Sequence, residues 1–123
     1  AASDVYKRQS VDRLAKGTEI QTAISGRVVT NEFAPIINTF LREHLFYDIF
    51  ARDVLTWQQR ELATVGALAG IGNVNPQLTS HFGAAMNTGL TPEQLQEAVD
   101  VLNETVSTDT GSNAQAVLNN VLK

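Results

Sequence analysis

The sequence contains no cysteine and only two histidines, and these two scarcities limit its chemistry. Without thiols, the chain has no thiol nucleophile, no disulfide framework and no thiolate metal site. Two imidazoles, His44 and His81, cannot make a three-histidine metal site within one chain. His44, His81 and Glu61 together are suitable ligand types, but their spacing matches no known metal signature. We therefore expect no metal and no cofactor.

Long apolar runs and an excess of positive charge are also missing. No apolar run reaches the roughly 18 residues that span a bilayer, and residues 1–9 lack the apolar region of a signal peptide. The net charge is −4 and no basic stripe stands out. We expect neither a membrane nor a nucleic acid as a partner. We expect a cytoplasmic protein, with a periplasmic protein that has lost a leader as the alternative.

The patterns that are present are helical. The chain has 123 residues, of which 43% are hydrophobic, and this is enough for one domain with a single core. No convincing alternating pattern predicts a strand, so the expected fold is all-α, with about six helices including short ones. Residues 1–30 are predicted to form an arm with short helices, and residues 31–123 a helical domain. A helical turn is expected from Val11 to Ala15, ending at Gly17, and a short helix from Thr18 to Ile24. Further helices are expected to begin at Pro35, Trp57, Pro76, Pro92 and Ser112, with a break over residues 106–110 before the last. Thr91 and Gln94 have the spacing of a capping box for the helix from Pro92, whose apolar stripe includes Leu95 and Val99.

The helix after Thr56 carries a carboxylate on its apolar side. Thr56 and Gln59 have the spacing of a capping box. At about 100° per residue, Glu61 shares one side of the helix with Val65 and Leu68. Carboxylates are rarely buried unless they are paired, and a buried glutamate suits acid–base chemistry. The alternative is a structural glutamate that pairs with an arginine at an interface or lies at the wet edge of this side.

The following helix carries one of the two histidines beside its apolar stripe. Asn75 is expected to cap this helix, Pro76 to take its first position and Gly89 to end it. His81 borders a stripe made by Leu78, Phe82, Ala85 and Met86. Imidazole changes its charge near neutral pH, which makes His81 a candidate for proton transfer. The alternative is a histidine whose hydrogen bonds are satisfied in the core or at an interface.

The helix from Pro35 is expected to place the other histidine inward. His44 falls in the same helical phase as Ile37, Phe40, Leu41 and Leu45. Asp48 and Arg52 follow in the next segment, and the guanidinium of Arg52 can bind a carboxylate through two hydrogen bonds. We therefore group His44, Asp48 and Arg52 as candidate substrate-binding residues. For Arg52 the alternative is a surface salt bridge worth less than ~1 kcal/mol.

Two segments of the chain resemble a known family. LTWQQRELATVGALAG, followed by SHFGAAMNTGLTPEQLQEAV, is similar to the carboxymuconolactone decarboxylase family, which has the all-helical fold of the alkyl hydroperoxidase D superfamily. The shared features are Arg60-Glu61-Leu62 after a capped start, His81 about twenty residues later, and the turn Asn87-Thr88-Gly89-Leu90-Thr91. The resemblance runs from about Pro35 to Leu102. The chain also looks like one repeat of the family members that carry two.

The resemblance implies one chemistry and excludes another. Peroxidase members carry Cys-x-x-Cys just before the histidine, where this chain has Val74 and Gln77, so peroxidase activity is not available. The lactone decarboxylases need neither thiol nor cofactor, and they act on a small dicarboxylated unsaturated lactone in the degradation of aromatic compounds. By resemblance, His81 is the proton donor and Glu61 is its partner or base.

The resemblance also implies how the substrate is held and how the chain assembles. His44 would be a second polar contact in the site, and Arg52 would hold a substrate carboxylate. The family implies a homo-oligomer, a trimer or hexamer, whose ligand is a small acid or lactone. The alternative function is a non-catalytic or small-molecule-binding helical oligomer that retains the family scaffold.

Overall fold

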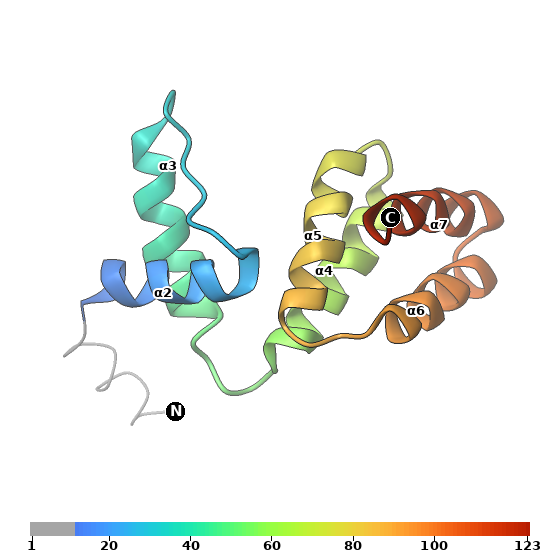
Figure 1. Ribbon diagram of the computed structural model, residues 1–123, viewed down its shortest axis with the longest axis horizontal. Helices are drawn as coiled ribbons and strands as arrows, with labels where there is room; N and C mark the ends of the chain where they lie inside the picture. Colours follow the sequence, from blue (N-terminus) through green and yellow to red (C-terminus); the bar gives the residue numbers. More distant parts are fainter. Residues whose placement is uncertain (1–11) are drawn as a thin grey trace. The chain divides into compact units, whose positions relative to one another are not determined.

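The computed structural model describes residues 12–123, which belong to two units divided after Thr56 (Figure 1). Every regular element in this part of the chain is helical, with six α-helices and one π-helix, and no strand occurs there. The expected all-α fold is thus confirmed. Among the same residues, no helix has both the length and the apolar character needed to cross a membrane.

The first unit consists of two crossing helical rods. Helix α2 (Arg13–Ser25) is capped by Asp12, whose side chain accepts a hydrogen bond from the backbone N–H of Ala15. Helix α3 (Pro35–Phe40) continues directly into the π-helix η1 (Leu41–Ile49). α2 packs across η1 (Figure 1), and the buried apolar side chains between them are those of Ile20, Ile24, Phe46, Tyr47 and Phe50.

Gly17 lies inside α2, and the predicted break into two short helices at this residue is wrong. A Cβ atom at Gly17 would overlap the carbonyl oxygen of Arg42 in η1. The glycine therefore marks the closest approach of two helices rather than the end of one, because only a residue without Cβ lets the two backbones come this close. Nε of Arg42 also donates a hydrogen bond of 3.4 Å to the side-chain oxygen of Gln21 in α2.

Replacing Gly17 by alanine is expected to destabilise the protein by about 1–3 kcal/mol, because the added Cβ meets backbone that cannot move aside. Gly66, in the middle of another helix, is the matched control, since a Cβ there meets nothing within 4 Å. Gly66→Ala should raise the free energy of unfolding by about 0.5–1 kcal/mol. Denaturant unfolding of both variants measures the difference. Equal effects of the two substitutions would contradict the close approach at Gly17.

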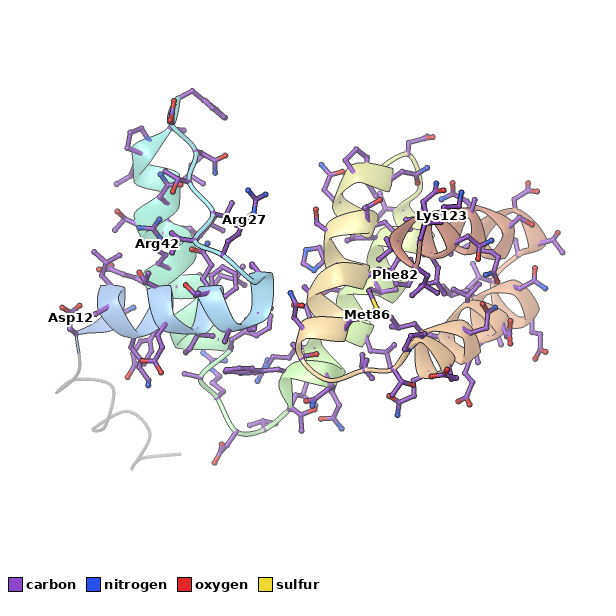
Figure 2. The ribbon with its side chains drawn as sticks, viewed as in Figure 1. Asp12, Arg27, Arg42, Phe82, Met86 and Lys123 are labelled. Atoms are coloured by element: carbon purple, nitrogen blue, oxygen red, sulfur yellow. The ribbon has the colours of Figure 1, made fainter. Side chains whose placement is uncertain are left out.

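The second unit is a four-helix arrangement around one core. It contains α4 (Trp57–Ile71), α5 (Asn75–Asn87), α6 (Pro92–Thr105) and α7 (Thr108–Val121). α4 packs on α5, α6 packs on α7, and α7 also contacts α5. Phe82 and Met86 project from α5 toward the side where α6 and α7 pack (Figure 2). The buried core consists of Val65, Ala69, Leu78, Phe82, Ala85, Leu95, Val99, Ala114, Val117 and Leu118.

The helix ends in this unit follow the sequence in part. The capping box of Thr91 and Gln94 is confirmed, and Gly89 follows α5 with φ 107°, as expected of a helix stop. Asn75 does not cap α5. It lies within the helix, and its side-chain amide exchanges two hydrogen bonds of 3.1 and 2.9 Å with Asn113 of α7.

The predicted start of the last helix at Ser112 is also wrong. α7 begins at Thr108, and Ser107 caps it by accepting a hydrogen bond from the backbone N–H of Thr110. The sequence predicts a break over residues 106–110, but Ser107 is a capping residue and α7 begins directly after it. Gly111 is buried where α7 meets α6, and a Cβ there would overlap Asn103.

Candidate functional site

The side chains of Glu61 and His81 meet between α4 and α5. The distance from Glu61 Oε2 to His81 Nδ1 is 2.7 Å. This is the length of a charge-assisted hydrogen bond. The two residues are twenty positions apart in the sequence and lie on separate helices, as predicted. In the structure they form a single hydrogen-bonded pair.

The turn between α4 and α5 brings the two residues together. Gly72 and Asn73 both have positive φ, 72° and 57°. A left-handed residue ends a helix and turns the chain sharply, and glycine and asparagine adopt this conformation at the least cost. α5 therefore runs back along α4, and His81 reaches the level of Glu61.

The two partners differ strongly in exposure. The Glu61 side chain is 1% exposed, and Val65 and Ala69 are buried further along the same side of α4. The His81 side chain is 37% exposed. The prediction that Glu61 lies on the buried side of its helix, with His81 at the border of an apolar stripe, is confirmed. A buried carboxylate is costly without a partner, and the imidazole N–H supplies one.

The hydrogen bond defines the roles of the two imidazole nitrogens. An ionised carboxylate only accepts hydrogen bonds, so Nδ1 of His81 carries the proton that it donates to Glu61. Nε2, on the opposite side of the ring, then carries a lone pair when the ring is neutral and an N–H when the ring is protonated. The pair can thus accept or deliver a proton at Nε2 while Nδ1 stays fixed.

A second histidine–carboxylate pair lies in the first unit. Nδ1 of His44 is 3.3 Å from Oδ2 of Asp48, and Nη2 of Arg13 contacts the same oxygen at 2.5 Å. The His44 ring also packs on the ring of Phe40, with centroids 5.0 Å apart. The sequence predicted no role for Arg13, because its contact with Asp48 joins positions 35 residues apart, and no local pattern indicates such a contact.

The prediction that His44 faces inward is wrong, since its side chain is 51% exposed. Ile37 and Phe40, which were expected on the same inward side, are exposed as well. The His44 ring packs on Phe40, so the two residues share one side of the helix, and that side faces solvent. Phe46 and Tyr47 are the buried residues of η1 instead.

The remaining candidate, Arg52, is exposed in the segment after η1, where its backbone N–H donates to the carbonyl of Ile49. Arg52, His44 and Asp48 belong to the first unit, whereas Glu61 and His81 belong to the second. Within residues 12–123, no three or more histidine, aspartate or glutamate side chains come together as a metal site.

The buried carboxylate–imidazole pair lies in a part of the chain that matches a known protein family. Residues 35–119 match the carboxymuconolactone decarboxylase family, and the matched region runs across both units and includes Glu61 and His81. The chain belongs to this family. A search of curated proteins returns no match to the chain.

Proposed function

We propose that the protein is a cofactor-independent decarboxylase that acts on a small carboxylated lactone or a related acid. The observation that carries the proposal is the 2.7 Å contact between a buried carboxylate and a half-exposed imidazole. Membership of the carboxymuconolactone decarboxylase family supports the choice of reaction. The absence of cysteine from the sequence removes the thiol chemistry available to this fold.

The proposed reaction needs one proton from the protein. The bond between the carboxylate carbon and the ring carbon breaks, and its electron pair moves into an extended enolate conjugated with the lactone carbonyl. Carbon dioxide leaves. Protonated His81 then gives the proton on Nε2 to the enolate carbon, and solvent returns a proton to the ring. Glu61 acts as a positioning residue, because it fixes Nδ1 and stabilises the positive charge on the imidazole.

Within the first unit, the guanidinium of Arg52 is proposed to bind a carboxylate, with His44 and Asp48 as further polar groups of the same unit. Assembly into a trimer or hexamer is part of the same proposal. The strongly exposed apolar side chains of Phe33, Ile36 and Phe40 support it, because such a concentration is typical of an interface.

The direct test is decarboxylation of γ-carboxymuconolactone by the purified full chain, followed as substrate loss and carbon dioxide release. The control compound is the product of the proposed reaction, the decarboxylated lactone formed when the enolate takes up its proton. His81 should also remove from this compound the hydrogen that it adds in the forward reaction, because proton transfer is reversible. In D₂O, that hydrogen should therefore be replaced by deuterium.

Turnover and deuterium exchange test two different parts of the proposal, the identity of the substrate and the proton transfer by His81. Turnover together with exchange supports both the substrate and the proton transfer. Exchange without turnover would sustain the proton transfer and overturn this particular substrate. Neither reaction, with protein that is folded and binds the lactone, would overturn the catalytic function and leave a binding protein on the family scaffold.

A further inference from the structure

A groove on the second unit lies between α6 and α7, and none of its lining residues comes from α4 or α5. Its volume is about 430 Å³, within the range of small-molecule sites. The polar side chains that line it are those of Asp100, Asn103, Ser112, Gln115 and Asn119. The site proposed above for decarboxylation uses none of these residues.

The groove exists because small residues face each other across the junction of the two helices. Gly111 allows the backbones of α6 and α7 to approach closely, since a Cβ there would overlap Asn103. Further along α7, Ser112 and Ala116 add little bulk, so the space beside the close approach stays open. Val99 and Ala116 supply the apolar part of the lining.

A network of amides holds much of the polar lining in place. Gln96 and Gln115 exchange two hydrogen bonds of 2.5 and 2.8 Å between α6 and α7. Gln96 also donates to Oδ1 of Asp100, and Gln115 donates to Oδ1 of Asn119, each at 3.0 Å. Side chains that are already ordered lose less entropy when a ligand binds, so this lining is preorganised.

The same lining retains hydrogen-bonding capacity. Asn103 and Ser112 are exposed, and among residues 12–123 neither the amide of Asn103 nor the hydroxyl of Ser112 hydrogen-bonds to another residue. In the same part of the chain, Oδ2 of Asp100 accepts no hydrogen bond and Nδ2 of Asn119 donates none. The lining therefore offers a ligand both hydrogen-bond donors and hydrogen-bond acceptors.

The charge of the lining restricts the ligand. Asp100 is the one charged residue in it, and neither lysine nor arginine contributes. An anion, including the carboxylated lactone proposed above, would be repelled by Asp100 without a compensating cation. A neutral compound with neighbouring hydroxyl groups satisfies both kinds of group, because each hydroxyl donates and accepts.

We propose that the groove between α6 and α7 binds a small, neutral, polyhydroxylated compound of the size of a monosaccharide or cyclitol. Asp100 accepts from one hydroxyl, and the amides of Asn103 and Asn119 donate to others. The carbon-bound hydrogens of the ring lie on Ala116. This site does not depend on the proposed decarboxylation.

The test is titration of the ¹⁵N-labelled full chain with myo-inositol and, separately, D-glucose, followed by the side-chain amide signals. We expect saturable shifts at Asn103, Gln115 and Asn119, with a dissociation constant of the order of 1–10 mM for single sugars. Ser112→Leu fills the groove at an exposed position and should abolish the shifts. Ser80→Leu is the matched control, an exposed serine in α5 outside the groove, and should leave them unchanged.

Several outcomes would overturn the proposal. These are the absence of saturable shifts with either compound, shifts that persist in Ser112→Leu, and shifts produced by tetramethylammonium but by neither polyol. Shifts that depend on protein concentration alone would assign the groove to contact with a second copy and also overturn it. A failure of lactone turnover would leave the result of this titration unaffected, because the two sites share no residue.

Discussion

Turnover of γ-carboxymuconolactone is expected to fall by about 10²–10⁴-fold when His81 is replaced by glutamine, the range typical of a lost general acid. Glutamine retains an N–H that can donate to the buried carboxylate of Glu61, but it cannot deliver a proton. The fall should appear in kcat, with KM little changed, because His81 is proposed to act in the transition state and not in binding the substrate. Steady-state kinetics at several pH values measure it.

The choice of glutamine separates chemistry from folding. In His81→Ala, the carboxylate of Glu61 would remain buried without its imidazole partner. A buried polar group left without its hydrogen bond costs about 1–3 kcal/mol. His81→Ala is therefore expected to lose both stability and activity, whereas His81→Gln should lose mainly activity. Full activity in His81→Gln would refute the proton-transfer role.

Glu61→Gln is the companion variant, and it tests positioning. Its amide can still accept from Nδ1, but it no longer supplies the negative charge that stabilises a protonated ring. We expect kcat to fall by at least about 10²-fold with KM little changed, since loss of the orienting carboxylate in comparable triads is severe. A purely structural Glu61 would change the free energy of unfolding and leave the kcat of the folded protein unchanged.

The features that the sequence predicted well are local. The inward positions Leu95 and Val99 of α6, the capping box at Thr91 and the burial of Glu61 all follow from spacing within one helix. The meeting of Glu61 and His81 needed two such helices to pack, and both apolar stripes indicated the correct faces. Helical periodicity thus carries information about which face is buried, even for an ionisable residue.

The features that the sequence did not predict depend on distant partners. Glycine has a low helix propensity, so the sequence predicts a helix end at Gly17. The structure continues α2 through Gly17, because η1 packs closely against the helix there. The exposure of His44 depends on which side of its helix packs on α2, and the structure buries Phe46 and Tyr47 while Phe40 and His44 stay exposed. Asn75 and Asn113 are 38 residues apart in the sequence, and their hydrogen bonds join α5 to α7. No local rule fixes any of these three.

The largest stability loss from a single truncation is expected at Phe82, which is completely buried in the core of the second unit. Phe82→Ala should lower the free energy of unfolding by about 3–5 kcal/mol, from lost burial and the cavity left behind. Because Phe82 follows His81 directly, loosening α5 should also weaken the hydrogen bond to Glu61. Denaturant unfolding and the kinetics of lactone turnover, measured on the same samples, test both effects.

Phe33 offers the same substitution at an exposed position, since it is 89% exposed. In dilute protein, Phe33→Ala should change the free energy of unfolding by less than about 0.5 kcal/mol. If copies of the chain cover this face, the cost of Phe33→Ala should grow with protein concentration, because association stabilises the folded state by mass action. The cost of Phe82→Ala should persist at every concentration, because its contacts lie within one chain. A cost below about 1 kcal/mol for Phe82→Ala would contradict the burial of Phe82 in the core of the second unit.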